Sequence, residues 1–216
     1  MPEPTFETSR RSALARVAVL LGVIATLVAG AWAPEPDPVP RRWQLDFKLG
    51  PLRMATFDMP GGGSQSYYYL TYRVTNTSGQ DLLLAPAFEL STAAGELLRS
   101  GRDVPAQVTS QILELLGNPL IEDQIGILGV IMQGEENARD GVVIWPITDM
   151  HPEEIAIYAS GFSGETKYED TKDPKTGQPD RKVLRKSYMA RYTMPGELDG
   201  HGSRPFPPYE QRWIMR

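Results

Sequence analysis

Acidic side chains are the chemically capable groups that this sequence gathers most densely. Five of them lie close together in the chain: Glu122, Asp123, Glu135, Glu136 and Asp140. Grouped carboxylates can bind calcium, and a pair can work as acid and base when one member is removed from water. The five lie among polar neighbours, where hydration keeps a carboxylate ionised. The pattern therefore favours an acidic interaction surface over a catalytic pair.

The two histidines, His151 and His201, are the other candidates for metal or acid–base chemistry. His201 lies in the segment GELDGHG with Glu197 and Asp199, and together these could hold a cation in an exported hydrolase or metal-dependent enzyme. Neither histidine has a second ligand at the spacing of a zinc site. We expect a glycine-rich surface loop at His201 and a turn at His151, with no metal and no cofactor.

Further catalytic motifs are missing from the sequence. The chain has no cysteine, which excludes disulfides, thiol nucleophiles and thiolate metal sites. The glycine run 61–63 follows a proline and precedes a strand pattern, so it lacks the context of a phosphate-binding loop. Asp170, Asp173 and Asp180 lack the spacing of a calcium loop and are typical of an ordinary turn.

Tyrosines offer a second candidate interaction surface. In the stretch SYYYLTYRVTN, residues Tyr68, Leu70, Tyr72 and Val74 alternate with their neighbours and are predicted to face a core. The same alternation places Tyr67 and Tyr69 on the outer face. Two exposed phenol rings could stack against a ligand. We therefore count Tyr67 and Tyr69 among the candidate contact residues.

The bulk composition limits both the partners and the number of domains. A formal net charge of -5 and the absence of a basic stripe argue against nucleic-acid binding. A content of 41% hydrophobic and 23% charged residues is typical of a folded globular chain. After the N-terminal segments are set aside, residues 43–216 have the length of one domain.

The N-terminal segment predicts an export signal or a membrane anchor. Residues 1–16 carry three arginines, and residues 17–33 contain no charge and would span about 25 Å as a helix. Small residues at 29–31 fit a signal peptidase site, while a segment that is not cut stays as a single-pass anchor. The arginines predict a cytoplasmic N-terminus and an extracytoplasmic remainder. The proline-rich segment 34–42 is expected to act as a stiff stalk.

Strand patterns dominate the body of the chain. Alternating or β-branched stretches are separated by glycine, proline and polar turn residues. They occupy the following ranges: 43–49, 52–59, 66–76, 81–92, 96–98, 141–147, 154–162, 166–193 and 207–216. The range 166–193 predicts a long hairpin with its tip at 173–180. The charged stretch GEENARDG, at 134–141, is interpreted as a turn.

Residues 103–133 depart from this pattern and predict a helical hairpin inserted between strands. Asp103 is placed to cap a first helix that ends at Gly117. Asn118 and Pro119 are then placed to start a second helix, whose apolar stripe would continue to Met132. The acidic residues Glu122 and Asp123 would lie on that second helix.

The order of these elements resembles a known class of domain. The stretch YYYLTYRVTNTSGQDLLLAPAFEL is similar to the strand–turn–strand pattern of immunoglobulin-like domains in bacterial envelope proteins. The stretches GVVIWP and EEIAIYASGFSGE are similar to a later strand pair of such domains, so the resemblance covers about residues 67–165. It implies an immunoglobulin-like antiparallel β-sandwich in an extracytoplasmic setting. It carries no catalytic residues.

The sequence thus predicts a mainly β protein that works as a non-catalytic interaction or structural module of the cell envelope. Its expected partners are the membrane, through the N-terminal helix, and another envelope protein that docks on the helical insert and its acidic exit. The alternatives are an exported hydrolase or metal-dependent enzyme that uses the acidic turn or the GELDGHG loop, and an envelope component that assembles with itself.

Overall fold

The computed structural model describes residues 43–172 and 177–216. The predicted cytoplasmic, membrane and stalk segments, 1–16, 17–33 and 34–42, lie outside the described residues, as does Asp173 at the hairpin tip. Neither described range contains a helix with the length and apolarity needed to cross a bilayer. The described part of the chain is mainly β and resembles a sandwich of antiparallel sheets, as the strand patterns predict.

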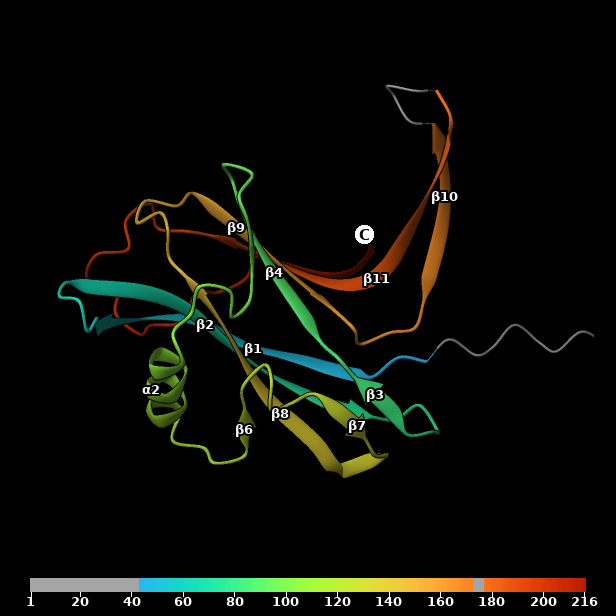
Figure 1. Cartoon of the computed structure of the whole chain (residues 1–216), viewed down its shortest axis with the longest axis horizontal. Helices are drawn as coiled ribbons and strands as arrows, with labels where there is room; N and C mark the ends of the chain where they lie inside the picture. Colours follow the sequence, from blue (N-terminus) through green and yellow to red (C-terminus); the bar gives the residue numbers. More distant parts are fainter. Residues whose placement is uncertain (1–42, 173–176) are drawn as a thin grey trace, which may run out of the picture. The chain divides into compact units, whose positions relative to one another are not determined.

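Two larger sheets and one small sheet form the part of the chain that the structure describes (Figure 1). In spatial order, the four-stranded sheet contains β1 (Asp46–Asp58), β2 (Ser64–Asn76), β8 (Gly134–Pro146) and β6 (Ile121–Glu122). The six-stranded sheet contains β10 (Thr166–Lys172), β11 (Pro179–Thr193), β9 (Glu154–Ser160), β4 (Ala87–Thr92) and β5 (Leu97–Arg99), with β12 (Glu210–Met215) also paired to β11. The small sheet pairs β3 (Leu82–Leu84) with β7 (Gly129–Ile131).

The main core lies between the two larger sheets. Tyr68, Leu70, Tyr72 and Val74 on β2 all face it and are at most 3% exposed, as the period-two pattern predicts. The opposite wall includes Phe88 and Leu90 on β4, Ile155 and Ile157 on β9, and Tyr192 on β11. One whole face of β2 is therefore buried in the main core.

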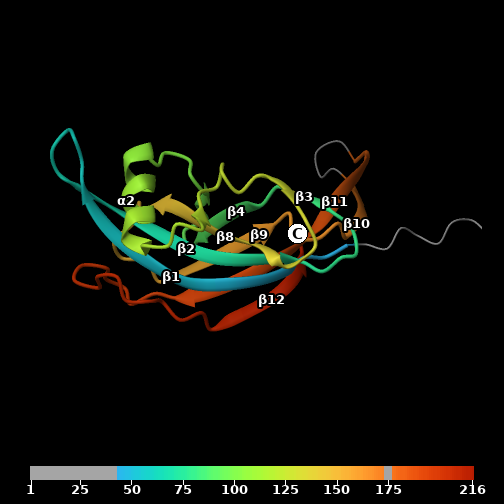
Figure 2. The same cartoon turned by 90° about the horizontal axis from the view of Figure 1, so that it is seen from below.

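The second face of the four-stranded sheet is also buried, because helix α2 (Ala106–Leu116) packs on it. Tyr67 and Tyr69 are 2% and 3% exposed and cluster with Val108 and Ile112 of the helix. Figure 2 shows α2 on one side of the β1–β2–β8 sheet and β12 on the other. The prediction that Tyr67 and Tyr69 form an exposed contact surface is therefore wrong: a helix more than thirty residues later in the sequence covers them.

The predicted helical hairpin is half correct. Helix α2 forms and ends at Gly117, whose φ of 60° is the left-handed conformation expected of a C-terminal glycine. Its start is wrong, because the cap position belongs to Pro105, and Asp103 adopts a φ of 59° outside the helix. Because Val108 and Ile112 lie one helical turn apart, both point into the cluster beneath the helix.

The predicted second helix, from Asn118 to about 133, is wrong. The side chain of Asp123 accepts hydrogen bonds from the backbone N–H groups of Ile125 and Gly126, which fixes a turn where helical bonds would be needed. Gly129 then adopts a φ of 146° at the start of β7. Local polar bonds and glycine thus outweigh the helical spacing of the apolar residues.

The stretch 134–141, predicted as a charged turn, is instead the first half of β8. Its charges do not interrupt the strand, because neighbouring strands supply partners. Asp140 pairs in register with Arg73 of β2, with Nε of the arginine and Oδ1 of the aspartate 3.7 Å apart.

The strand β1 is also longer than predicted. It continues through the predicted break between residues 49 and 52, where its pairing with β2 shifts in register. Gly50 lies there so close to Thr71 that any side chain at position 50 would overlap it.

Candidate functional site

The five acidic residues predicted as a contact surface do not form one site. Glu122 lies on β6 with its Oε2 3.8 Å from Nε of Arg139, and Asp140 faces Arg73. Asp123 uses its side chain to hold a turn. Glu135 and Glu136 are exposed at the start of β8. In residues 43–172 and 177–216, no three His, Asp or Glu side chains are grouped as a metal site would require.

The GELDGHG loop is held together by its own contacts. The ring of His201 stacks on Phe206 with centroids 4.1 Å apart, and its Nε2 lies 3.1 Å from the carbonyl oxygen of Arg204. A surface hollow of about 800 Å³ borders this loop, and Asp199 is the one charged residue among the described residues that line it. Glu197 and His201 do not line it. His151 is exposed in a turn, where its backbone N–H donates to Oδ1 of Asp149.

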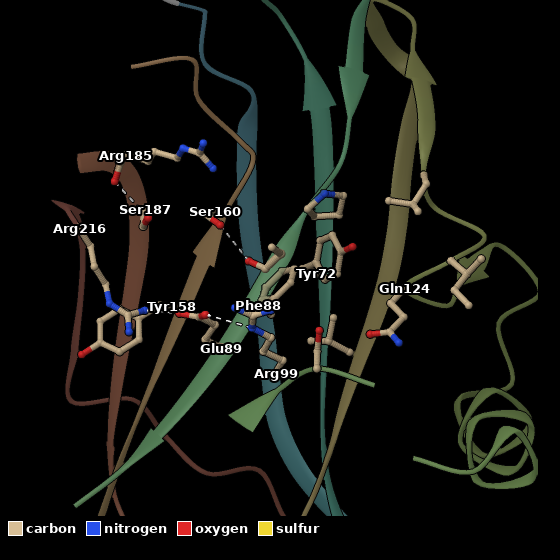
Figure 3. Close-up of a pocket in the computed structure, with 16 residues that line it drawn as sticks. Tyr72, Phe88, Glu89, Arg99, Gln124, Tyr158, Ser160, Arg185, Ser187 and Arg216 are labelled. Atoms are coloured by element: carbon tan, nitrogen blue, oxygen red, sulfur yellow. Dashed lines mark hydrogen bonds and ion pairs between the residues drawn. The ribbon is translucent and has the colours of Figure 1, made fainter. Parts of the chain in front are cut away.

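A different group of residues lines another hollow, of about 680 Å³, beside β4 (Figure 3). We name it the arginine hollow after its charged residues. These are Glu89 on β4, Arg99 on β5, Arg185 on β11, and Arg216, which follows β12. Three arginines and one glutamate therefore line the hollow, in a chain whose formal net charge is -5.

Strand register places these charges. Glu89 is directly opposite Arg99 on one side and Tyr158 of β9 on the other. The backbones of Arg216 and Arg185 exchange two hydrogen bonds of 2.7 and 3.1 Å, which extends the β11–β12 ladder to the edge of the hollow. Glu89, Tyr158 and Met189 lie at one level of the ladders, and Arg185 lies four residues from Met189 along β11 on the same face, so these charges line one face of the sheet.

Two of the three arginines are already partnered. Arg216 donates a 2.7 Å hydrogen bond from Nη1 to Oε2 of Glu89, and its guanidinium lies 3.9 Å from the ring centroid of Tyr158. Arg99 places Nε 3.7 Å from Oε1 of the same carboxylate. Arg185 has no hydrogen-bond or ion-pair partner for its guanidinium among the described residues, and Figure 3 shows its side chain pointing away from β11.

Two of the serine hydroxyl groups that line the hollow donate to the backbone. Ser160 donates to the carbonyl of Ala87 at 3.3 Å, and Ser187 donates to the carbonyl of Arg185 at 3.2 Å. The cationic donors are guanidinium N–H groups, which carry no acceptor, while the amide of Gln124 and the hydroxyls of Ser100 and Tyr158 can donate or accept. Glu89, the one carboxylate, already accepts from Arg216. The charged groups of the hollow are therefore mostly donors, and a ligand rich in acceptors such as carboxylates complements them.

The opposite wall of the hollow is apolar. Phe88, Val143 and Tyr72 reach it from the core, while Ile125 and Leu128 line it with 71% and 50% of their surface exposed. The buried hydroxyl of Tyr72 has no hydrogen-bond partner among the described residues. Burial raises the pKa of Tyr72 above its ordinary value, and the charge of Glu122 raises it further, so this hydroxyl stays protonated. One side of the hollow is thus cationic and the other apolar.

The arginine hollow was not predicted from the sequence. The pair formed by Glu89 and Arg99 could have been predicted, because the predicted turn at Ala94 and Gly95 joins two strands in which these residues are directly opposite each other. Arg185 and Arg216 have no such local signal, since their position depends on how β11 and β12 pair with each other.

Comparison with known proteins gives no relative for this chain: no family model, no curated protein and no solved structure matches it.

Proposed function

We propose that this chain is a non-catalytic extracytoplasmic binding module of the cell envelope, and that its ligand is an anionic group held in the arginine hollow. The uncharged run 17–33 and the proline-rich segment 34–42 support a tethered or exported domain. The resemblance of the strand patterns to immunoglobulin-like domains supports the same setting and makes that class of sandwich part of the proposal.

The observation that carries this proposal is the charge of the hollow. Three arginines and one carboxylate line it; Arg99 and Arg216 pair with that carboxylate, and the guanidinium of Arg185 is without a partner among the described residues. Like charges brought together in a partly enclosed space repel each other, and an anion relieves that repulsion. The surrounding chain is acidic overall, so the hollow stands out as a cationic site.

Binding of a defined anionic probe tests the proposal. Full-length protein in nanodiscs of neutral lipid is titrated into fluorescein-labelled hexaglutamate, and anisotropy is followed at low salt. We expect saturable binding that weakens as salt is added, and no binding of labelled hexalysine. Arg185→Gln should reduce the affinity about three- to fivefold, the range typical of one exposed charge pair.

The matched control is Arg73→Gln on β2, which removes an exposed arginine outside the hollow. It lowers the net charge of the protein by the same amount but should leave hexaglutamate binding unchanged. Equal losses in both variants would show that only the overall charge matters and would overturn the hollow as the binding site. Absence of hexaglutamate binding to the unmodified protein would also overturn it.

The envelope setting has its own test. Protease added to bacterial spheroplasts should digest the domain while cytoplasmic proteins stay intact, and the intact mass of the purified protein should show whether residues 17–33 are retained. Protection of the domain until the cells are lysed would contradict the extracytoplasmic orientation.

A further inference from the structure

We infer that the ligand is an extended acidic peptide segment of a partner protein, one that also carries a large apolar side chain, and that the β10–β11 hairpin continues the arginine hollow into a single surface for it. This inference rests on the function proposed above and adds the class of the ligand and a second part of the site. We call β10 together with residues 179–186 of β11 the arm.

The arm and the hollow share one strand. β11 runs without interruption from Pro179 to Thr193, and Arg185 and Ser187 line the hollow. Alternate residues of a strand lie on one face, so Val183 and Arg181 continue the face that carries Arg185. Figure 1 shows the arm leaving the rest of the sandwich at this strand. A ligand that lies along this face would pass from the hollow onto the arm.

The face of the arm carries an exposed apolar pair. Tyr168 on β10 is directly opposite Val183 in the ladder, and the two are 62% and 49% exposed. The next pair along the same face is Asp170 and Arg181, which are joined by a 2.6 Å bond. A two-stranded ribbon buries little apolar surface by itself, so a partner's apolar side chain laid on Tyr168 and Val183 would stabilise it.

The charge of the arm matches that of the hollow. On the face that carries Tyr168 and Val183, alternation places three basic residues, Lys172, Arg181 and Arg185, and one acidic residue, Asp170, which is paired with Arg181. The arm is therefore cationic within an acidic chain, like the arginine hollow to which it leads. An extended segment with several carboxylates would meet a favourable charge along the whole path.

The balance of donors and apolar groups favours a peptide over an acidic sugar chain. Sugar hydroxyl groups need acceptors as well as donors, and Glu89, the carboxylate among the described residues of the hollow, is already paired with Arg216 and Arg99. Ile125 and Leu128 on one wall, and Tyr168 with Val183 on the arm, instead offer apolar contacts at both ends of the path. Carboxylates alternating with apolar side chains match this arrangement, and recognition of acidic motifs by arginine clusters is a known mode of peptide binding.

The test compares two labelled peptides on the full-length protein in neutral nanodiscs: hexaglutamate, and a six-residue peptide with the sequence Glu-Leu-Glu-Glu-Leu-Glu. We expect the leucine-containing peptide to bind more tightly although it has fewer charges. The double variant Tyr168→Ser/Val183→Ser should weaken its binding about five- to tenfold, the effect of removing one moderate anchor, and should leave hexaglutamate binding unchanged. Both side chains are exposed, so the fold should tolerate the change.

The control is Leu120→Ser, which removes another exposed leucine that lines neither the hollow nor the arm. It should affect neither peptide. The inference is overturned, with the proposed function intact, if hexaglutamate binds at least as well as the leucine-containing peptide, or if the double variant leaves the binding of the leucine-containing peptide unchanged. Tighter binding of a labelled hexamer of galacturonic acid than of either peptide would replace the peptide by an acidic glycan. Absence of binding by all three probes would defeat the proposed function itself.

Discussion

The guanidinium carbon of Arg216 lies 3.9 Å from the centroid of the Tyr158 ring, and at the same time the guanidinium donates a hydrogen bond to Glu89. The aromatic ring and the carboxylate hold this arginine in place without filling its donor capacity. Glu89 therefore has two effects on the hollow. It positions Arg216, and it competes with any ligand carboxylate for Arg216 and Arg99.

Removing the charge of Glu89 should strengthen the binding of acidic ligands. In Glu89→Gln the amide keeps the size of the side chain but no longer neutralises the two arginines. We expect hexaglutamate to bind about threefold more tightly at low salt, and the gain to shrink as salt screens the charges. Anisotropy titrations at two salt concentrations measure this. Weaker binding would mean that positioning of Arg216 by Glu89 matters more than the competition.

Gly141 should be sensitive to the smallest substitution. It is the cross-strand partner of Tyr72, and a Cβ added there would overlap the tyrosine ring. We expect Gly141→Ala to lower the free energy of unfolding by about 1–3 kcal/mol, the usual cost of overpacking. Urea denaturation measures it. The control is Gly61→Ala at the tip of the β1–β2 hairpin, where a Cβ meets open space and no change is expected.

Helix α2 should be held mainly by its two buried side chains. Ile112 is fully buried between the helix and the tyrosines of β2, whereas Leu115 on the same helix is 55% exposed. We expect Ile112→Ala to cost about 2–4 kcal/mol of unfolding free energy and Leu115→Ala less than about 1 kcal/mol. Equal costs in urea denaturation would contradict the packing of α2 on this sheet face.

Glu154 should make the stability depend on acid. Its carboxylate accepts hydrogen bonds from Arg191 at 2.6 Å and from Tyr209 at 2.9 Å, and these bonds lower its pKa below the ordinary 4.5, the arginine having the larger effect. A group whose pKa is lower in the folded state stabilises that state above its unfolded pKa, and the contribution is lost as the pH falls through the folded pKa. As the pH is lowered below about 4.5, the melting temperature of Glu154→Gln should therefore fall less steeply than that of the unmodified protein.

The comparison for that experiment is Glu153→Gln, a substitution at the exposed neighbouring carboxyl. It should leave the acid dependence of the melting temperature as it is in the unmodified protein. If both variants lose the same part of the dependence, the bonds from Arg191 and Tyr209 are not its source.

The strands and one face of the core were predictable because alternation is a local property. Tyr68 and Tyr72 face the core as their spacing predicts. The burial of Tyr67 was not predictable, because it depends on α2 folding back over the sheet. The prediction of a second helix was wrong because it rested on the spacing of apolar residues and did not consider the hydrogen bonds by which Asp123 forms a turn.

The candidate site was less predictable than the fold. The acidic residues attract notice because they are close together in the sequence, yet Glu122 and Asp140 are used in pairs with arginines of adjacent strands. The arginines that do gather come from distant parts of the chain, and their meeting depends on the register of β4, β9, β11 and β12. Register between strands far apart in sequence has no local signature.

The same long-range pairing has a consequence for the kinetics of folding. The ladder that carries Glu89 joins Phe88 to Ala159, and the edge of the hollow is completed only when Arg216 pairs with Arg185. Sheets built from such distant segments have a high contact order and fold in milliseconds to seconds, because long loops must close first. We therefore expect the arginine hollow to form in the last kinetic phase of refolding, after the local β1–β2 and β10–β11 hairpins. A nascent or truncated chain without β12 would have these hairpins but no complete hollow.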